Sequence, residues 1–426
     1  EQHGESVATA PAAPPARTSP PGRSRGPVQS GLFAASGRDY VAVVRVLMLS
    51  WEYPPHLIGG IATHVEGVAT ALARAGHEVV VCTTAASGDE DSDCVVDGVR
   101  VLRADVGLPW LPDDEFVART ISVNSHMVRI TARLAGWRPD VVHAHDWLTA
   151  WAADSLRALH GAPMVATVHA TERGRHGGHL PPGLPGTVNS AEWWLSYQAR
   201  RVIACSRYMV REVIDGFDLP PDKVHLVPNG IDVARWTTDQ AGAGGRDPLV
   251  VAWGRVQYEK GFQVLVRAVA ELRHRVPGLR CVIAGRGTYL PDLQGQIDVD
   301  GVGDIVHLAG FVPDADLRAL LADAACVVIP SLYEPFGIVA LEGMAAGAPV
   351  VVARTGGLAE IVAGTGAGQL FEPGSSHDLA AAIERVLSDP EAAEHMRTEA
   401  AALLRRTYSW DAVAAATLHV YETAAV

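Results

Sequence analysis

Short apolar runs rich in β-branched residues alternate with amphipathic stretches from about residue 44 to the C-terminus. This alternation is typical of parallel sheets that are covered by helices on both faces. The strands predicted in the first half of the chain are Val44–Trp51, Glu78–Thr84, Val99–Ala104, Asp140–His145, Met164–His169, Val202–Ser206 and Val224–Pro228. The stretch after the first strand has one apolar face at helical spacing, formed by Ile61, Val65, Val68, Ala69 and Leu72. Residues 44–236 are therefore expected to form a doubly wound α/β domain.

The same pattern restarts after a Gly-rich segment, residues 237–247, which has the composition of a linker. The further predicted strands are Leu249–Gly254, Arg280–Ala284, Ile305–Leu308, Cys326–Pro330 and Pro349–Ala353. The predicted helices are Phe262–Arg275, Gly337–Ala346 and Ser376–Leu387. Residues 248–409 thus predict a second Rossmann-like domain, and a closing helix over residues 410–426 can cross back to the first. A chain of 426 residues is long enough for two such domains facing each other across a cleft.

Composition narrows the possible partners and the compartment. The net charge of -13 disfavours nucleic acid and anionic membrane as partners, because both are negatively charged. No apolar run reaches the roughly 18 residues of a membrane helix, and the five cysteines show no CxxC or metal spacing. Residues 1–43, rich in Pro, Ala, Gly and Ser, predict a disordered extension. The expectation is a cytoplasmic protein with no transmembrane segment that acts on a small or neutral substrate.

Gly59-Gly60 lies between the first predicted strand and the helix that follows it. A glycine pair lets the backbone approach a phosphate, and the free amides at the start of a helix bind anions. A plain turn is the alternative interpretation. The chain lacks the G-x-G-x-x-G dinucleotide motif at this point, which disfavours a nicotinamide-dependent dehydrogenase.

Three histidines are predicted at the carboxyl ends of neighbouring strands, where ligands of open α/β sheets bind. The two-residue strand repeat places His143 and His145 on one face, with Asp146 next to them, and His169 follows the next strand. A metal cluster is one interpretation of this set. The other, which we prefer, is a group of polar residues that grip a sugar and its acceptor.

Two loops of the second half carry charges suited to a nucleoside diphosphate. Arg255 and Lys260 follow its first strand, where a guanidinium and an ammonium can hold a diphosphate, although two solvated surface charges are the alternative. Glu334-Pro335-Phe336-Gly337 forms a tight loop before a helix that contains Glu342. Glu342 can accept both hydroxyls of a ribose, and Glu334 a hydroxyl of a transferred sugar. By contrast, Asp91-Ser92-Asp93 is expected to be a solvated charge run in a loop rather than a metal site.

Taken together, these motifs resemble the family-4 retaining glycosyltransferases of the GT-B fold, over residues 44 to 426. The residues that carry the resemblance are Ser50-Trp51-Glu52-Tyr53-Pro54-Pro55 with Gly59-Gly60, His145-Asp146-Trp147, His169, Gly254-Arg255 with Lys260-Gly261, and Glu334 with Glu342. Within that family the chain looks like the bacterial α-glucan glucosyltransferases related to glycogen synthase. It departs from glycogen synthases in having Leu57-Ile58, not a Lys-x-Gly-Gly loop, at the first glycine site.

The resemblance implies a role for each matched position. Catalytic roles fall to Asp146 and His169 beside the sugar and acceptor, Arg255 and Lys260 on the diphosphate, and Glu334 on the transferred sugar. Donor-binding roles fall to Gly59 and Gly60 near the phosphates, to the backbone of Phe336, Gly337 and Ile338, and to Glu342 on the ribose.

The predicted activity is transfer of a hexose, expected to be glucose, from ADP-glucose or UDP-glucose to a glycan acceptor, with retention and without a metal or other cofactor. Retention is expected to proceed by same-face attack through an oxocarbenium-like state. The alternatives are a GT-B transferase with a lipid, disaccharide or small-molecule acceptor, a glycan phosphorylase, a metal-dependent hydrolase and a non-catalytic glycan-binding protein.

Overall fold

The computed structural model describes residues 42–56, 59–112, 114–237 and 247–426. Nearly all of the predicted N-terminal extension and of the predicted linker, and the Leu57-Ile58 dipeptide, lie outside these described residues. Within them, no helix is long and apolar enough to cross a membrane.

The first half of the described chain is built on an eight-stranded sheet. Its strand order is β3-β4-β2-β1-β5-β6-β7-β8, and all neighbours are parallel except the antiparallel pair β3 and β4. The strands are β1 Arg45–Leu49, β2 Glu78–Thr84, β3 Ser92–Val96, β4 Val99–Ala104, β5 Val141–His145, β6 Met164–Val168, β7 Arg201–Ala204 and β8 Val224–Leu226. The strand order reverses between β1 and β5, which is the point where sheets of this kind bind ligands.

The second half contains a six-stranded, wholly parallel sheet in the order β11-β10-β9-β12-β13-β14. Its strands are β9 Leu249–Trp253, β10 Arg280–Ala284, β11 Val306–Gly310, β12 Cys326–Ile329, β13 Val350–Ala353 and β14 Gln369–Phe371. Here the order reverses between β9 and β12. The predicted fold class, two doubly wound α/β domains, is confirmed.

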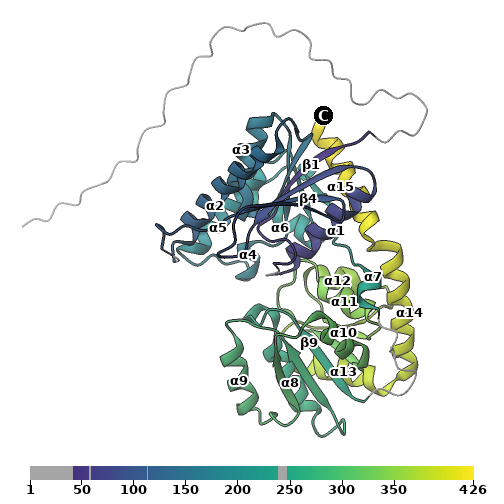
Figure 1. Cartoon of the computed structure of the whole chain (residues 1–426). Coiled ribbons are helices and arrows are strands. Elements are labelled where there is room, and N and C mark those ends of the chain that lie inside the picture. The colour runs from purple at the N-terminus through teal and green to yellow at the C-terminus, as the bar shows by residue number, and fades with distance from the viewer. Residues whose placement is uncertain (1–41, 57–58, 113, 238–246) are drawn as a thin grey trace, which may run out of the picture. The chain divides into compact units, whose positions relative to one another are not determined.

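Helices cover both faces of each sheet (Figure 1). Those that accompany the first sheet are α1 Gly60–Arg74, α2 Phe116–Ile130, α3 Ala150–His160, α4 Glu172–Arg175, α5 Leu184–Gln198, α6 Arg207–Phe217 and α7 Val233–Trp236. The helices that follow the first sheet in the chain are α8 Phe262–Leu272, α9 Leu290–Val299, α10 Asp314–Asp323, α11 Ile338–Ala345, α12 Gly356–Val362, α13 Ser376–Ser388, α14 Pro390–Thr407 and α15 Trp410–Ala425.

The buried central strands explain the near-continuous apolar runs in the sequence. Successive residues of β1 point to opposite faces, so Val46 and Met48 pack in one core cluster and Leu47 and Leu49 in the other. A strand that is buried on both faces needs apolar residues at every position.

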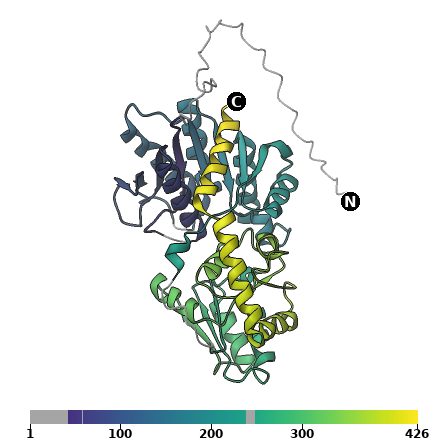
Figure 2. The same cartoon turned by 90° about the vertical axis from the view of Figure 1, so that its right-hand side faces the viewer.

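The last helix, α15, packs on the first sheet although it follows the second in sequence. It contacts α1, β6 and β7, and it is drawn in yellow in Figure 2, where it continues from α14. Trp410, Val413 and Tyr421 are buried in the same cluster as Val46. A Cβ atom added to Gly67 of α1 would lie 2.2 Å from the Trp410 ring, so glycine permits the close approach of the two helices.

The acidic stretch around Asp91 is a correction to the sequence analysis. Ser92 and Asp93 belong to β3, an edge strand, and not to a loop. Asp91 pairs with Arg129 at 2.7 Å and Asp93 with Arg100 at 2.8 Å. Most of β3 is exposed, so its side chains lack the apolar alternation that marks a half-buried strand.

Candidate active site

The start of α1 lies directly against the start of α11. Glu52 accepts a hydrogen bond from the backbone N–H of Gly59 at 2.8 Å and so shapes the turn into α1, which begins at Gly60. A Cβ atom at Gly60 would lie 3.1 Å from Cδ1 of Ile338, the first residue of α11. The structure therefore brings two of the predicted donor-binding positions together. The positive ends of two helix dipoles meet at this point, which favours an anion.

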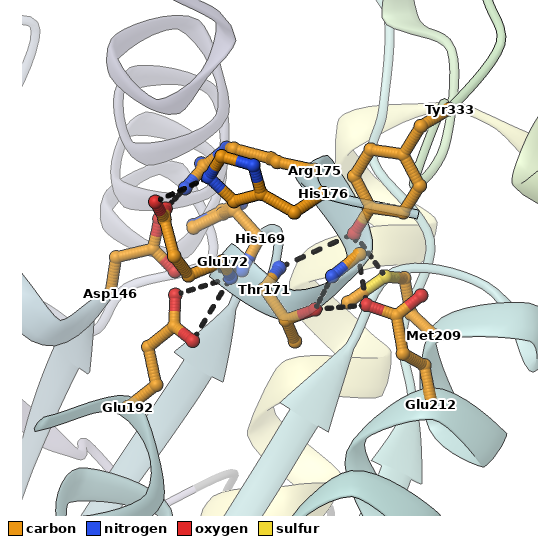
Figure 3. Close-up of polar contacts among 11 residues, drawn as sticks. Asp146, His169, Thr171, Glu172, Arg175, His176, Glu192, Met209, Glu212 and Tyr333 are labelled. Carbon is orange, nitrogen blue, oxygen red and sulfur yellow. Dashed lines mark hydrogen bonds and ion pairs between the residues drawn. The ribbon is translucent and has the colours of Figure 1, made fainter. Parts of the chain in front are cut away.

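Asp146 and His169 are joined at the ends of β5 and β6. A carboxylate oxygen of Asp146 accepts the backbone N–H of His169 at 2.9 Å, and Nδ1 of His145 shares a hydrogen bond with Nε2 of His169 at 3.2 Å. Figure 3 shows Asp146 and His169 beside the short helix α4. The predicted neighbourhood of these side chains at the carboxyl edge of the sheet is thus confirmed.

Asp146 has an unusual backbone conformation, with φ 61° and ψ 169°. Residues other than glycine rarely adopt this region, and such conformations cluster at functional sites. Its backbone N–H donates to Thr167 O at 3.0 Å, which helps to fix it. Burial raises the pKa of Asp146 to about 6, while its hydrogen bond from His169 and the charge of Arg175 act in the opposite direction. The Asp146 carboxyl therefore lies at the carboxyl edge of the sheet and can be either protonated or ionised near neutral pH.

Burial lowers the pKa of His169 to about 3, so its imidazole is neutral at physiological pH. A neutral imidazole can exchange hydrogen bonds with a sugar hydroxyl without adding a charge to the site. This state suits a residue that contacts a neutral substrate.

A polar network that the sequence analysis missed links the first sheet to the loop after β12. Glu212 accepts hydrogen bonds from the hydroxyls of Thr171 and of Tyr333, the latter at 3.0 Å (Figure 3). The Tyr333 hydroxyl also accepts the backbone N–H of Thr171 at 3.3 Å. Tyr333 precedes Glu334 directly, so the network helps to hold the loop that carries this carboxylate.

Lys260 and Glu334 form an ion pair at 2.8 Å, and Ser331 donates a hydrogen bond to the same carboxylate at 3.1 Å. Both charged side chains are partly accessible. Gly261 follows Lys260 with φ 71°, and a Cβ atom there would lie 1.9 Å from Pro330 O. Only glycine fits, which explains the Lys-Gly pair. Arg255, five residues before Lys260, is exposed on the loop after β9.

Glu342 lies in α11 and accepts a hydrogen bond from the indole N–H of Trp253 at 3.1 Å. Burial raises its pKa to about 7, and the Trp253 bond acts in the opposite direction. Gly337, with φ 108°, precedes α11, and a Cβ atom there would lie 2.4 Å from Leu358. The side chain of Phe336 is buried against the core, so any ligand contact of this residue is made by its backbone.

His143 differs from its two companions. It lies beside His145 on one face of the strand, as predicted, with ring centroids 4.2 Å apart and the ring planes tilted by 37°. Both of its nitrogens, however, are engaged. One shares a hydrogen bond with Thr167 Oγ1 at 2.8 Å and the other with the Tyr421 hydroxyl at 2.7 Å. The metal cluster considered in the sequence analysis therefore cannot include His143. Instead, His64 of α1 lies beside His169, with ring centroids 4.9 Å apart.

Two doubly wound sheets, each with polar groups beside its switch point, define the fold as GT-B, and the solved structures agree. Sucrose-phosphate synthase from Thermosynechococcus elongatus matches with a TM-score of 0.76 and 23% identity, over 89% of this chain and 98% of the other. The catalytic domain of starch synthase IV from Arabidopsis thaliana, bound to ADP and acarbose, matches with a TM-score of 0.71 and 18% identity, over 90% and 100%.

Sequence comparison gives the family. The Glycosyltransferase Family 4 model matches residues 58–235 and the Glycosyl transferases group 1 model residues 236–402. A protein of Mycobacterium tuberculosis named glycogen synthase is 40% identical over 392 residues, which cover 89% of this chain and 94% of that protein. The chain belongs to glycosyltransferase family 4.

Proposed function

We propose that this chain is a retaining hexosyltransferase that transfers glucose from ADP-glucose or UDP-glucose to an α-1,4-glucan. One observation carries the proposal: the first residues of α1 and α11 touch, through Gly60 and Ile338. Lys260 and Glu334 form an ion pair between the loops that follow β9 and β12, at the carboxyl edge of the second sheet. The glucan acceptor is supported by the 40% identity to the mycobacterial protein named glycogen synthase.

The donor is proposed to bind through its charged and hydroxyl groups. Arg255, which is exposed, and Lys260 hold the diphosphate, assisted by the amides of Gly337 and Ile338. Glu342 accepts the ribose hydroxyls. The side chain of Glu334, already held by Lys260 and Ser331, accepts a hydroxyl of the glucose.

In the proposed reaction the bond between the anomeric carbon and the phosphate oxygen breaks, and a bond to the acceptor oxygen forms on the same face. The acceptor's proton passes to the departing phosphate oxygen, so no protein carboxylate acts as a nucleophile. Arg255, Lys260 and the helix amides stabilise the negative charge that develops on the diphosphate. This division of roles supports our expectation that transfer needs no metal ion.

The test is an assay of nucleoside diphosphate release from a panel of nucleotide sugars with maltooligosaccharides, for the native chain and for Arg255→Ala and Lys260→Ala. Each substitution is expected to lower kcat roughly 10²-fold, as for other groups that stabilise transition-state charge. Arg267→Ala, which removes an exposed cation on α8, is the matched control and should leave turnover unchanged. Full activity in both site variants would refute the donor-site assignment, and phosphate-dependent release of glucose 1-phosphate would indicate a phosphorylase.

A further inference from the structure

Three imidazoles from separate elements of the first sheet converge on one point. They belong to His64 in α1, His145 at the end of β5 and His169 after β6. One ring nitrogen of each lies within 4.8 Å of the other two. His64 and His145 are almost completely buried, with 3% and 0% exposure.

One ring nitrogen of this group, His64 Nδ1, is buried without a hydrogen-bond partner among the described residues. A buried polar atom of this kind calls for a bound water or ion.

The spacing fits a tetrahedral cation. Two nitrogens that each lie 2.0–2.1 Å from one zinc ion are about 3.4 Å apart. The distance between His145 Nδ1 and His169 Nε2 is 3.2 Å. The third nitrogen, within 4.8 Å, needs to move by at most about 1.4 Å, which a small side-chain rotation provides.

The rings also pack directly on one another. The His64 ring lies 5.5 Å from that of His145 and 4.9 Å from that of His169, measured between centroids. The Trp410 ring packs against His64 with centroids 5.8 Å apart, which limits the orientations open to the imidazole.

We propose that His64, His145 and His169 form a three-histidine site for Zn²⁺, with a water molecule as the fourth ligand. The ion is not a cofactor of sugar transfer. It occupies the His169 imidazole that the family resemblance places beside the sugar, and it therefore inhibits transfer; this consequence rests on the proposed function, whereas binding of the ion does not.

The test is a titration of the chelator-treated, dialysed full chain with Zn²⁺ against a chromophoric competitor. The native chain is expected to bind one ion, and His64→Gln and His145→Gln are each expected to weaken binding by 10-fold to 100-fold or more. His377→Gln, which alters an exposed histidine, is the control and should bind as the native chain does. Absence of saturable binding, or binding that both variants retain, would overturn the proposal.

A second measurement covers the case in which a variant does not fold. Co²⁺ added to the native chain should give the intense visible absorption of a four-coordinate ion, and the weak spectrum of a hydrated ion would contradict the site. Zinc binding by a chain whose metal-free form transfers no sugar would leave the site standing and refute the proposed function. Sugar transfer by a chain that binds no zinc would do the reverse.

Discussion

Donor affinity is predicted to depend on pH through Glu342. Burial raises the pKa of this carboxyl to about 7, and only the ionised form accepts both ribose hydroxyls well. The ionised fraction is about 9% at pH 6 and about 91% at pH 8, so the nucleotide sugar should bind roughly tenfold more tightly at pH 8. The diphosphate of a nucleotide sugar is esterified at both ends and keeps its charge over this range.

Calorimetric titration with the nucleotide sugar, without an acceptor, measures this dependence. The matched variant Glu342→Gln cannot ionise, and its affinity should be low and independent of pH. A native chain whose affinity stays constant between pH 6 and 8, or falls, would refute the reasoning. So would a Gln variant that keeps the native pH dependence, because another group would then be responsible.

The remaining predictions concern groups that support the site. Trp253→Phe removes an indole donor that favours the carboxylate of Glu342, so the midpoint of the binding profile should move up by about one pH unit. Gly174→Ala places a Cβ atom 2.4 Å from the Tyr333 ring and should lower the melting temperature clearly, whereas Gly186→Ala, with open space around it, should not. Glu192 is 3% exposed and its burial raises its pKa to about 8, above the unfolded value of 4.5. The contribution of its neutral form to stability is therefore present below pH 4.5 and lost as the pH rises through 8. At pH 9 the Glu192→Gln variant should be more stable than the native chain by a few kcal/mol, because each unit of pKa shift corresponds to about 1.36 kcal/mol. Thermal melts at a series of pH values measure this difference.

Most of the fold could be predicted because each buried strand corresponds to a run of apolar residues in the sequence. The predicted strand Glu78–Thr84 and the helix starting at Phe262 match β2 and α8 at those positions. The missed strands, β3 and β14, are edge strands of five and three residues. They bury too little apolar surface to show a pattern.

Only those residues of the candidate site that come directly after a predicted strand could be placed from the sequence. Because neighbouring parallel strands end at the same edge of a sheet, Asp146 and His169 were expected there, and the structure joins them with a hydrogen bond. It could not show that Tyr421, 278 residues away, engages His143. His64 was missed although it lies on the apolar face of α1, because a histidine among core positions carries no signal of its own until β5 and β6 are placed beside it.

The proposed sugar transfer is tested most directly by the proton NMR spectrum of the product formed from ADP-glucose or UDP-glucose and a maltooligosaccharide. The expected product is an oligosaccharide longer by one or more glucose units, with an α-configured new linkage and one diphosphate released per bond formed. A β linkage, or the absence of elongation with either donor, would contradict it.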